Sequence, residues 1–386
     1  MGTRSVLRDI VFQRWASDRD YSTGAGEGVT INGGSIAFGS AIAQVTHNSV
    51  HFEQAVWTSA PLAPGFGVQE IVPSWTADTP GGSWVQIEVR GPATPWYTLG
   101  RWASHDTVVR RATIPKHDDE NGTVDADTFR AAPDRELPSF QLRVSLMRPA
   151  GSADVPVLRS LGVMASRLPA PDRDLSASPP RSALGVILDV PGYSQKIHIG
   201  EYPEYDGGGG SWCSPTSTSM VMAYWGALPP AEDYDWVDAT LADRWVDHAA
   251  RGTYDHAYGG CGNWPFNTAY AGRYGLSGFV TRLRSLAEAE LFIAEGIPLI
   301  VSASYRSGEV CGLDYDTNGH IMVLVGFTAD GHPVLNDPNS ATGADVRKAV
   351  DRTEFERVWL NTSRGVVYVI TPPGRALPQP PQQANW

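Results

Sequence analysis

The sequence predicts a two-domain protein: an N-terminal all-β sandwich, jelly-roll-like, followed by a C-terminal α+β domain. In the first half, hydrophobic and polar residues alternate along several short runs, as in strands with one buried face. The second half instead has a glycine-rich loop leading into a predicted helix, and later an unbroken apolar run typical of a buried strand. A segment rich in proline and serine separates these two patterns, which indicates a linker.

These patterns divide the chain into four segments. We expect a β-sandwich accessory domain over residues 5–165, a Pro/Ser-rich linker over 166–184, an α+β catalytic domain over 185–372 and a Pro/Gln-rich tail over 373–386. A chain of 386 residues, 42% hydrophobic and 19% charged, is long enough to form two cores. The net charge of −12 makes nucleic acid and anionic membrane unsuitable partners, and no long apolar run predicts a membrane span.

In the first domain, residues 85–90 and 140–146 show the clearest strand alternation. Several such runs between Gly, Pro and Asp turns favour a sandwich. Four aromatic residues here look exposed: Trp75, Trp96, Tyr97 and Trp102. They could bind a glycan or another cell-surface ligand, or they could belong to the core, which is the commoner place for tryptophan in sandwiches.

The first ten residues lack the apolar stretch of a signal peptide. We expect the protein to be secreted, with the signal peptide absent from this chain. A cytoplasmic location is the alternative.

Cys213 lies where the glycine-rich loop meets the predicted helix, in the sequence Gly-Gly-Gly-Gly-Ser-Trp-Cys-Ser-Pro-Thr over residues 207–216. Pro215 suits the first turn of a helix, and Gly226 suits its end. The amides and dipole at a helix N-terminus stabilise a thiolate, the nucleophilic form of cysteine. Cys213 is therefore a candidate nucleophile, and a buried structural thiol is the alternative.

His320 opens a predicted buried strand over residues 318–327, and the next strand ends near Asp337. If Phe327 pairs with His332 in a hairpin, Asp337 lies diagonally across from His320 on the same face, with Cβ atoms about 7 Å apart. His320 would then act as base and acid, and Asp337 would fix the imidazole. Taken singly, these residues also fit an ordinary histidine and an ordinary turn.

Upstream of the cysteine loop, Gln195 offers a side-chain amide. Together with the backbone N–H of Cys213, it could stabilise the oxyanion of an acyl transfer, although a surface glutamine is the alternative. Helices beginning near residue 263 and over 285–295 and a strand over 298–304 complete this domain. The residues proposed to contact substrate are Gly210, Trp212, Trp264 and Asn318, although core packing explains the two tryptophans equally well.

These four blocks resemble a known family. The sequences Tyr-Ser-Gln195, Trp-Cys213-Ser-Pro-Thr, Gly-His320 before an apolar strand, and Asn-Asp337-Pro are similar to those of bacteriocin-processing, double-glycine leader peptidases and their stand-alone relatives among the papain-like cysteine peptidases. The resemblance covers about residues 185–372. It implies Cys213 as nucleophile, His320 as general base, Asp337 as third member and Gln195 in the oxyanion hole. The chain departs from the family in Ser214, where glycine is frequent, and in lacking an exporter's membrane and nucleotide-binding segments, so leader peptides are not the expected substrate.

Three function classes fit these observations. The leading one is a cysteine hydrolase that cleaves a peptide or other amide bond through a thioester. An acyltransferase or transpeptidase would use the same thioester with an amine acceptor. The third is an inactive binding protein that acts through its sandwich.

The remaining cysteines, Cys261 and Cys311, both lie in glycine-containing loops of the second half. A disulfide between them would leave Cys213 as the free thiol, as suits an exported cysteine enzyme, and two free thiols are the alternative. Metal-ligand spacing is absent, so no metal or other cofactor is expected.

Overall fold

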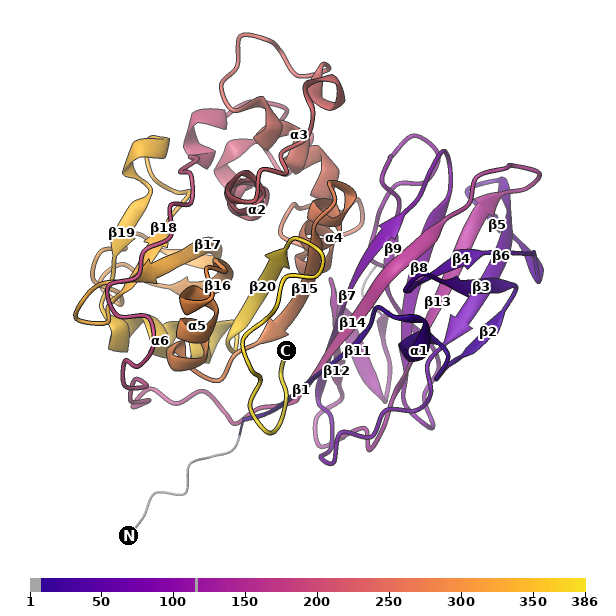
Figure 1. Ribbon diagram of the computed structural model, residues 1–386, viewed down its shortest axis with the longest axis horizontal. Helices are drawn as coiled ribbons and strands as arrows, with labels where there is room; N and C mark the ends of the chain where they lie inside the picture. The colour runs from indigo at the N-terminus through magenta and orange to yellow at the C-terminus, as the bar shows by residue number, and fades with distance from the viewer. Residues whose placement is uncertain (1–7, 115–116) are drawn as a thin grey trace. The chain divides into compact units, whose positions relative to one another are not determined.

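The computed structural model describes residues 8–114 and 117–386, which form two compact units (Figure 1). The β unit comprises residues 9–167, 255–259 and 386. The α+β unit comprises residues 8, 168–254 and 260–385.

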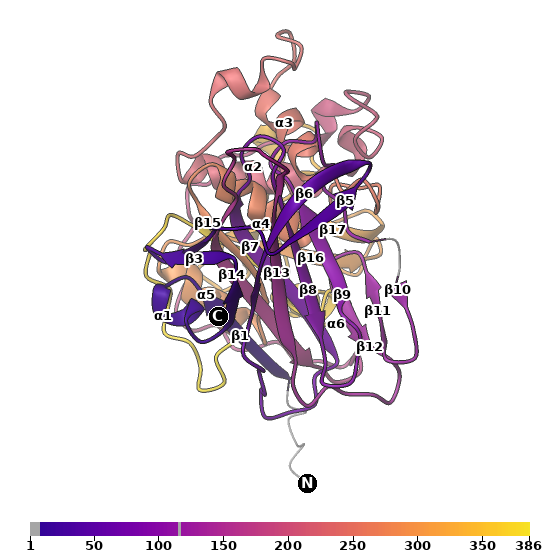
Figure 2. The ribbon, with the colours of Figure 1, turned by 90° about the vertical axis from the view of Figure 1, so that its right-hand side faces the viewer.

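The β unit consists almost entirely of strands, which confirms the all-β prediction for the first half. Its elements are β1 (Asp9–Trp15), α1 (Asp18–Tyr21), β2 (Ala25–Glu27), β3 (Val29–Asn32), β4 (Ser35–Phe38), β5 (Ala43–His47), β6 (Val50–Thr58), β7 (Glu70–Asp78), β8 (Trp84–Arg90), β9 (Tyr97–Trp102), β10 (His117–Asp118), β11 (Gly122–Asp125), β12 (Thr128–Ala131), β13 (Gln141–Pro149) and β14 (Val157–Arg167). Within the described residues they form two antiparallel sheets, one ordered β10-β11-β12-β7-β14-β4-β3 with β1 also on β14, the other β2-β6-β13-β8-β9 with β5 also on β6. Figure 2 shows this unit in front, after a turn of 90° about the vertical axis of Figure 1.

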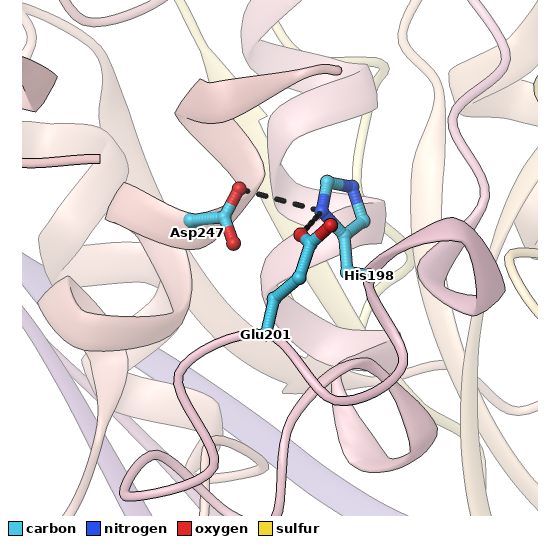
Figure 3. A group of neighbouring side chains, drawn as sticks. All are labelled: His198, Glu201 and Asp247. Carbon is cyan, nitrogen blue, oxygen red and sulfur yellow. Dashed lines mark hydrogen bonds and ion pairs between the residues drawn. The ribbon is translucent and has the colours of Figure 1, made fainter. Parts of the chain in front are cut away.

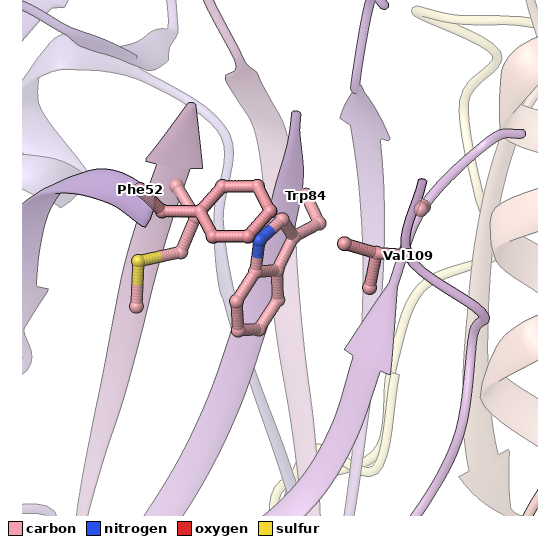
Figure 4. Close-up of a cluster of buried hydrophobic side chains, with 5 residues drawn as sticks. Phe52, Trp84 and Val109 are labelled. Atoms are coloured by element: carbon pink, nitrogen blue, oxygen red, sulfur yellow. The ribbon is translucent and has the colours of Figure 1, made fainter. Parts of the chain in front are cut away.

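The core of the β unit follows from the alternation along β8 and β13. Val144 pairs with Ile87, and both side chains are fully buried. At one end of the same sheet, Phe52 packs edge-on against Trp84, with ring centroids 5.7 Å apart, and Val109 completes the cluster (Figure 4). Burial of these apolar surfaces is the main stabilising contribution to such a unit.

Three of the four aromatic residues expected to be exposed are in fact core residues. Trp75, Tyr97 and Trp102 have at most 1% of their surface exposed, which corrects the prediction that they face solvent. These large aromatic side chains fill the core of the β unit, because each of them buries a large apolar surface there. The fourth, Trp96, is half-buried and lies against the guanidinium groups of Arg90 and Arg143, at 4.4 and 4.3 Å.

The α+β unit contains one antiparallel sheet and most of the helices. Its elements are η1 (Gln195–His198), η2 (Gly209–Ser211), α2 (Cys213–Tyr224), η3 (Ala231–Tyr234), α3 (Arg244–Thr253), α4 (Trp264–Arg273), β15 (Ser277–Arg282), α5 (Leu286–Ala294), β16 (Leu299–Tyr305), β17 (Thr317–Phe327), β18 (Pro333–Asn336), η4 (Gly343–Asp345), β19 (Arg347–Ala349), α6 (Arg352–Thr362) and β20 (Val366–Thr371). The strand order is β15-β20-β16-β17-β18-β19. Helices α2 and α4 pack on one side of this sheet, and α5 and α6 pack on the other (Figure 1).

Local capping explains where two of these helices begin. The Asn263 side chain accepts a hydrogen bond from the Phe266 amide at the start of α4, and Ser285 does the same for Glu288 in α5. The helices expected near residue 263 and over 285–295 are thus confirmed.

The Pro/Ser-rich segment is tied to the α+β unit by buried carboxylates. Glu290 in α5 accepts hydrogen bonds from the amides of Arg181 and Ser182, at 2.6 and 2.7 Å. Glu356 in α6 accepts from the amide and hydroxyl of Ser178. Near the end of the tail, the buried Asn385 side chain donates to the Arg282 carbonyl and to Glu288. None of the helices in the described part of the chain is both long and apolar enough to span a membrane.

Candidate active site

Cys213 is the first residue of α2, as the sequence predicts. The first helical hydrogen bond runs from the Thr216 amide to the Trp212 carbonyl, and Pro215 has no amide to donate. The amides of Cys213 and Ser214 therefore precede the helical ladder, at the positive end of the helix dipole. Cys213 is partly exposed.

Close backbone contacts fix the loop before Cys213. Gly207 and Gly208 adopt φ values of +73° and +91°, a region that favours glycine. A Cβ atom on Gly209 would lie only 2.2 Å from the Gln195 carbonyl oxygen, whereas one on Gly210 would meet nothing within 4 Å. The lack of a side chain at residue 209 thus allows η1 and η2 to approach each other.

His320 and Asp337 come together on adjacent strands. His320 Nε2 lies 2.7 Å from Asp337 Oδ1, and both side chains are buried. The expected hairpin register is wrong by one residue at its end, because Phe327 pairs with Pro333 and not with His332. A β-bulge between Leu324 and Gly326 shifts the register back, so the pairing nearer the site is the expected one.

The helix and the hairpin are held together next to these side chains. In α2, Ser217 Oγ donates to the carbonyl of Ile321, the residue after His320, at 3.1 Å. The Cys213 side chain acts on His320 as well, and it favours the charged form of the imidazole. Because Asp337 occupies Nε2, the imidazole nitrogen left for the sulfur is Nδ1.

Neighbouring groups shift the pKa values of His320 and Asp337 in the direction opposite to the effect of burial. Burial alone would lower the pKa of His320, but the hydrogen bond to Asp337 and the effect of Cys213 raise it to about 9. Burial would raise the pKa of Asp337, yet the hydrogen bond from His320 and the ammonium group of Lys348 hold it well below its usual range. The pair therefore favours imidazolium and carboxylate near neutral pH.

Two further residues contact Asp337, and the sequence analysis missed both. Lys348 Nζ in β19 lies 2.8 Å from Asp337 Oδ2, and the Tyr315 hydroxyl donates to the same oxygen at 3.1 Å. The Tyr315 ring also meets the His320 ring edge-on, with centroids 5.6 Å apart. No spacing in the sequence marks them, since β19 is three residues long and Tyr315 precedes β17.

Gln195 lies at the start of η1, beside the loop that leads to Cys213. Its Nε2 donates to the Gly210 carbonyl at 2.8 Å, and its backbone amide donates to the Pro338 carbonyl at 2.9 Å. Ser194 Oγ donates to the Ser340 carbonyl in the same turn. Gln195 is thus anchored both to the cysteine loop and to the turn that follows Asp337.

Of the four residues expected to contact substrate, one is buried and the other three are at least partly exposed. Trp212 is fully buried, and its indole N–H donates to the Tyr205 carbonyl, so it is a core residue and its expected substrate contact is wrong. Trp264 is half-buried at the start of α4. Gly210 is exposed, and so is Asn318, whose side-chain oxygen accepts a hydrogen bond from Arg306.

The expected disulfide is absent, because Cys213, Cys261 and Cys311 are all free. Cys261 is buried beside Trp212, Val246 and Ala250, where its thiol donates to the Ala250 carbonyl. Cys311 is exposed in a loop.

Among the described residues, one group of side chains has the composition of a metal site: His198, Glu201 and Asp247. It was not expected, because its members come from two separate segments.

Comparison with known proteins agrees with this geometry. Residues 187–367 match the Peptidase C39 like family, and residues 11–166 match the peptidase C39 N-terminal domain. The chain belongs to the peptidase C39-like family. Its β unit matches the N-terminal domain, and its α+β unit matches the peptidase-like family, so the resemblance drawn from the four sequence blocks is confirmed.

No curated protein matches the chain. Among solved structures, a family two carbohydrate esterase from Cellvibrio japonicus is 13% identical with a TM-score of 0.22; the match covers 51% of this chain and 43% of the esterase. A structure titled "CBM4 structure and function" is 13% identical with a TM-score of 0.20, covering 40% of this chain and 86% of that one. At these TM-scores neither likeness bears on fold or function.

Proposed function

We propose that the α+β unit of this C39-like protein is a papain-like cysteine hydrolase that cleaves a peptide or other amide bond. The observation that supports this most is the buried 2.7 Å contact between His320 and Asp337. Cys213, at the N-terminus of α2, acts on the same imidazole. A nucleophile, a base and a group that orients the base form the arrangement needed for acyl transfer. A helix carrying the nucleophile, packed on an antiparallel sheet carrying the other two, also fits the papain-like arrangement.

The proposed reaction begins with Cys213 as thiolate and His320 as imidazolium. The sulfur attacks the carbonyl carbon, and the carbonyl electrons move to oxygen. As the tetrahedral intermediate collapses, the C–N bond breaks and His320 gives its proton to the departing amine, which leaves a thioester. Neutral His320 then takes a proton from water, the hydroxide attacks the thioester, and Cys213 leaves as thiolate.

Two donors can stabilise the oxyanion. The Cys213 amide lies before the helical ladder, and the Gln195 amide group has a second N–H besides the one that donates to Gly210. Removal of one such donor costs about a hundredfold to a thousandfold in kcat. Asp337 keeps the proton of His320 on Nε2 and leaves Nδ1 for the thiol and the leaving group.

The test is hydrolysis of a broad peptide and amide library by the full chain. Cys213→Ala should abolish turnover, while Cys311→Ala, which removes an exposed thiol elsewhere, should leave it unchanged. Circular dichroism should show both variants folded. Equal turnover by wild type and Cys213→Ala would refute the proposal.

A further inference from the structure

Behind the proposed oxyanion residue lies a second cluster of ionisable side chains. His198, the last residue of η1, points its Nδ1 toward the carboxylates of Glu201 and Asp247 (Figure 3). The Nδ1 atom lies 2.7 Å from Glu201 Oε2 and 3.3 Å from Asp247 Oδ2. One donor atom from each residue falls within 4.8 Å of the other two.

The cluster is buried and its acceptors are not satisfied. His198 and Asp247 have no exposed side-chain surface, and Glu201 has 17%. The single proton that Nδ1 can carry lies toward Glu201, and neither oxygen of Asp247 receives a hydrogen bond from any residue that the structure describes. A fully buried carboxylate without hydrogen-bond donors is strongly unfavourable, so a missing positive partner is indicated.

The negative charge of the cluster also favours a bound cation. Two carboxylates surround one imidazole, and Asp243 adds a third negative charge close to His198 and Asp247. No lysine or arginine among the described residues forms an ion pair with Glu201 or Asp247. A dication would neutralise both carboxylates, whereas a proton on His198 neutralises only one.

We propose that His198 Nδ1, Glu201 and Asp247 bind a divalent transition-metal ion, with zinc as the best fit. An imidazole nitrogen with two carboxylate oxygens suits zinc, while calcium and magnesium prefer oxygen ligands alone. Ligands about 2.0–2.1 Å from zinc in a tetrahedron lie about 3.3 Å from each other. The distance from His198 to Asp247 already equals that separation, and Glu201 must move away from His198 by roughly half an ångström.

The site would join two segments that shape the active site. His198 ends the short helix that begins with Gln195, and Asp247 lies in α3, about fifty residues later. A bound ion would therefore fix η1 to α3 and hold Gln195 in place. This effect on catalysis rests on the proposed function, but metal binding itself does not.

The test is a zinc titration of the full chain, without a polyhistidine tag and stripped with a chelator, followed by calorimetry and by thermal unfolding. Wild type should bind one zinc ion per chain and unfold at a higher temperature with zinc present. Asp247→Asn should weaken binding by at least about a hundredfold. Even the loss of a residue that only hydrogen-bonds to a metal ligand lowers metal affinity by about 10–100-fold. The matched control is Glu204→Gln, an exposed acid of the same loop, which should bind zinc as wild type does.

Glu201→Gln supplies a second variant in case Asp247→Asn does not fold, because Glu201 lies at the partly exposed edge of the cluster. It should also lose tight zinc binding. A wild-type protein that binds no zinc at micromolar concentration would overturn the proposal. Binding of equal strength by wild type and a folded ligand variant would overturn it too. Neither readout depends on peptide hydrolysis, so the metal site can fail while the proposed function stands.

Discussion

Asp337 is buried with no exposed surface, yet each of its oxygens has two donors. Oδ1 accepts from His320 and from the Asn339 amide, and Oδ2 accepts from Lys348 and from the Tyr315 hydroxyl. A carboxylate with four charged or polar donors stays ionised when buried. This residue therefore sets the charge state of the whole candidate site.

The first prediction at this scale concerns Cys213. Because we propose that His320 takes the proton of Cys213, iodoacetamide should alkylate Cys213 in wild type faster than the model thiol glutathione at pH 6.5. His320→Ala should slow this labelling to the rate of the model thiol. Peptide mass spectrometry identifies the labelled cysteine, and exposed Cys311 in the same sample is the internal control. Labelling of Cys213 at the same rate in both proteins would contradict the proposed role of His320 as its base.

A second prediction uses the contact between Lys348 and Asp337. In Asp337→Asn the side-chain oxygen must face His320, so the amide N–H₂ group is turned toward the Lys348 ammonium, where two donors repel. Asp337→Asn should still retain more activity than Cys213→Ala, because an amide can orient the imidazole. Adding Lys348→Met should raise kcat/KM of Asp337→Asn, although the same change lowers that of wild type. A double variant that is worse than Asp337→Asn alone would exclude this account.

At the scale of elements, the approach of η1 to η2 depends on one glycine. Gly209→Ala would place a methyl group 2.2 Å from the Gln195 carbonyl, so one of the two short helices must shift. We expect a loss of about 1–3 kcal/mol in the free energy of unfolding, the usual cost of overpacking. Hydrolysis should also slow by about a hundredfold if Gln195 moves out of reach of the oxyanion.

The control is Gly210→Ala, since an added methyl group there meets nothing within 4 Å. Chemical denaturation should give this variant the stability of wild type. If Gly209→Ala were equally stable, the close approach of the two short helices would not constrain the loop.

Elements with strong local signals could be predicted from the sequence, and those defined by tertiary contacts could not. The helices after Asn263 and Ser285 begin at side chains that cap them, and the apolar run after His320 specifies a buried strand. The bulge that shifts the β17–β18 register has no such signal, and neither does the short strand that brings Lys348 to Asp337. Likewise, His198 and Glu201 meet Asp247 only because η1 and α3 pack together, so no spacing reveals the cluster.

At the scale of the whole molecule, the two units were predictable because hydrophobic periodicity changes between the halves. The exposure of single side chains was not predictable, because alternation alone does not distinguish a core tryptophan from a surface one. Trp75 and Trp102, which are buried, demonstrate this. The Pro/Ser composition indicated a linker, but it did not predict that this segment is bound to α5 and α6. The carboxylates that bind it, Glu290 and Glu356, lie more than one hundred residues away in the sequence.

The stability of the fold should depend on pH through the His320–Asp337 pair. The pKa of His320 rises from 6.5 to about 9 on folding, so its contribution is complete below pH 6.5 and is lost as the pH rises through about 9. The lowered pKa of Asp337 gives a contribution that is complete above its ordinary pKa of 3.8 and is lost in acid. Urea denaturation of wild type and His320→Gln should show a stability difference that shrinks between pH 7 and pH 9.5. A pH-independent difference would contradict the pairing.

The order of the site residues along the chain has a consequence during protein synthesis. A ribosome delivers Cys213 first, then His320, Asp337 and finally Lys348, and the last three belong to strands that must pair with each other. A nascent chain that has exposed only α2 therefore carries a thiol without its base. If the proposed chemistry holds, no partial translation product of this chain can cleave a neighbouring polypeptide before β17, β18 and β19 have emerged and folded.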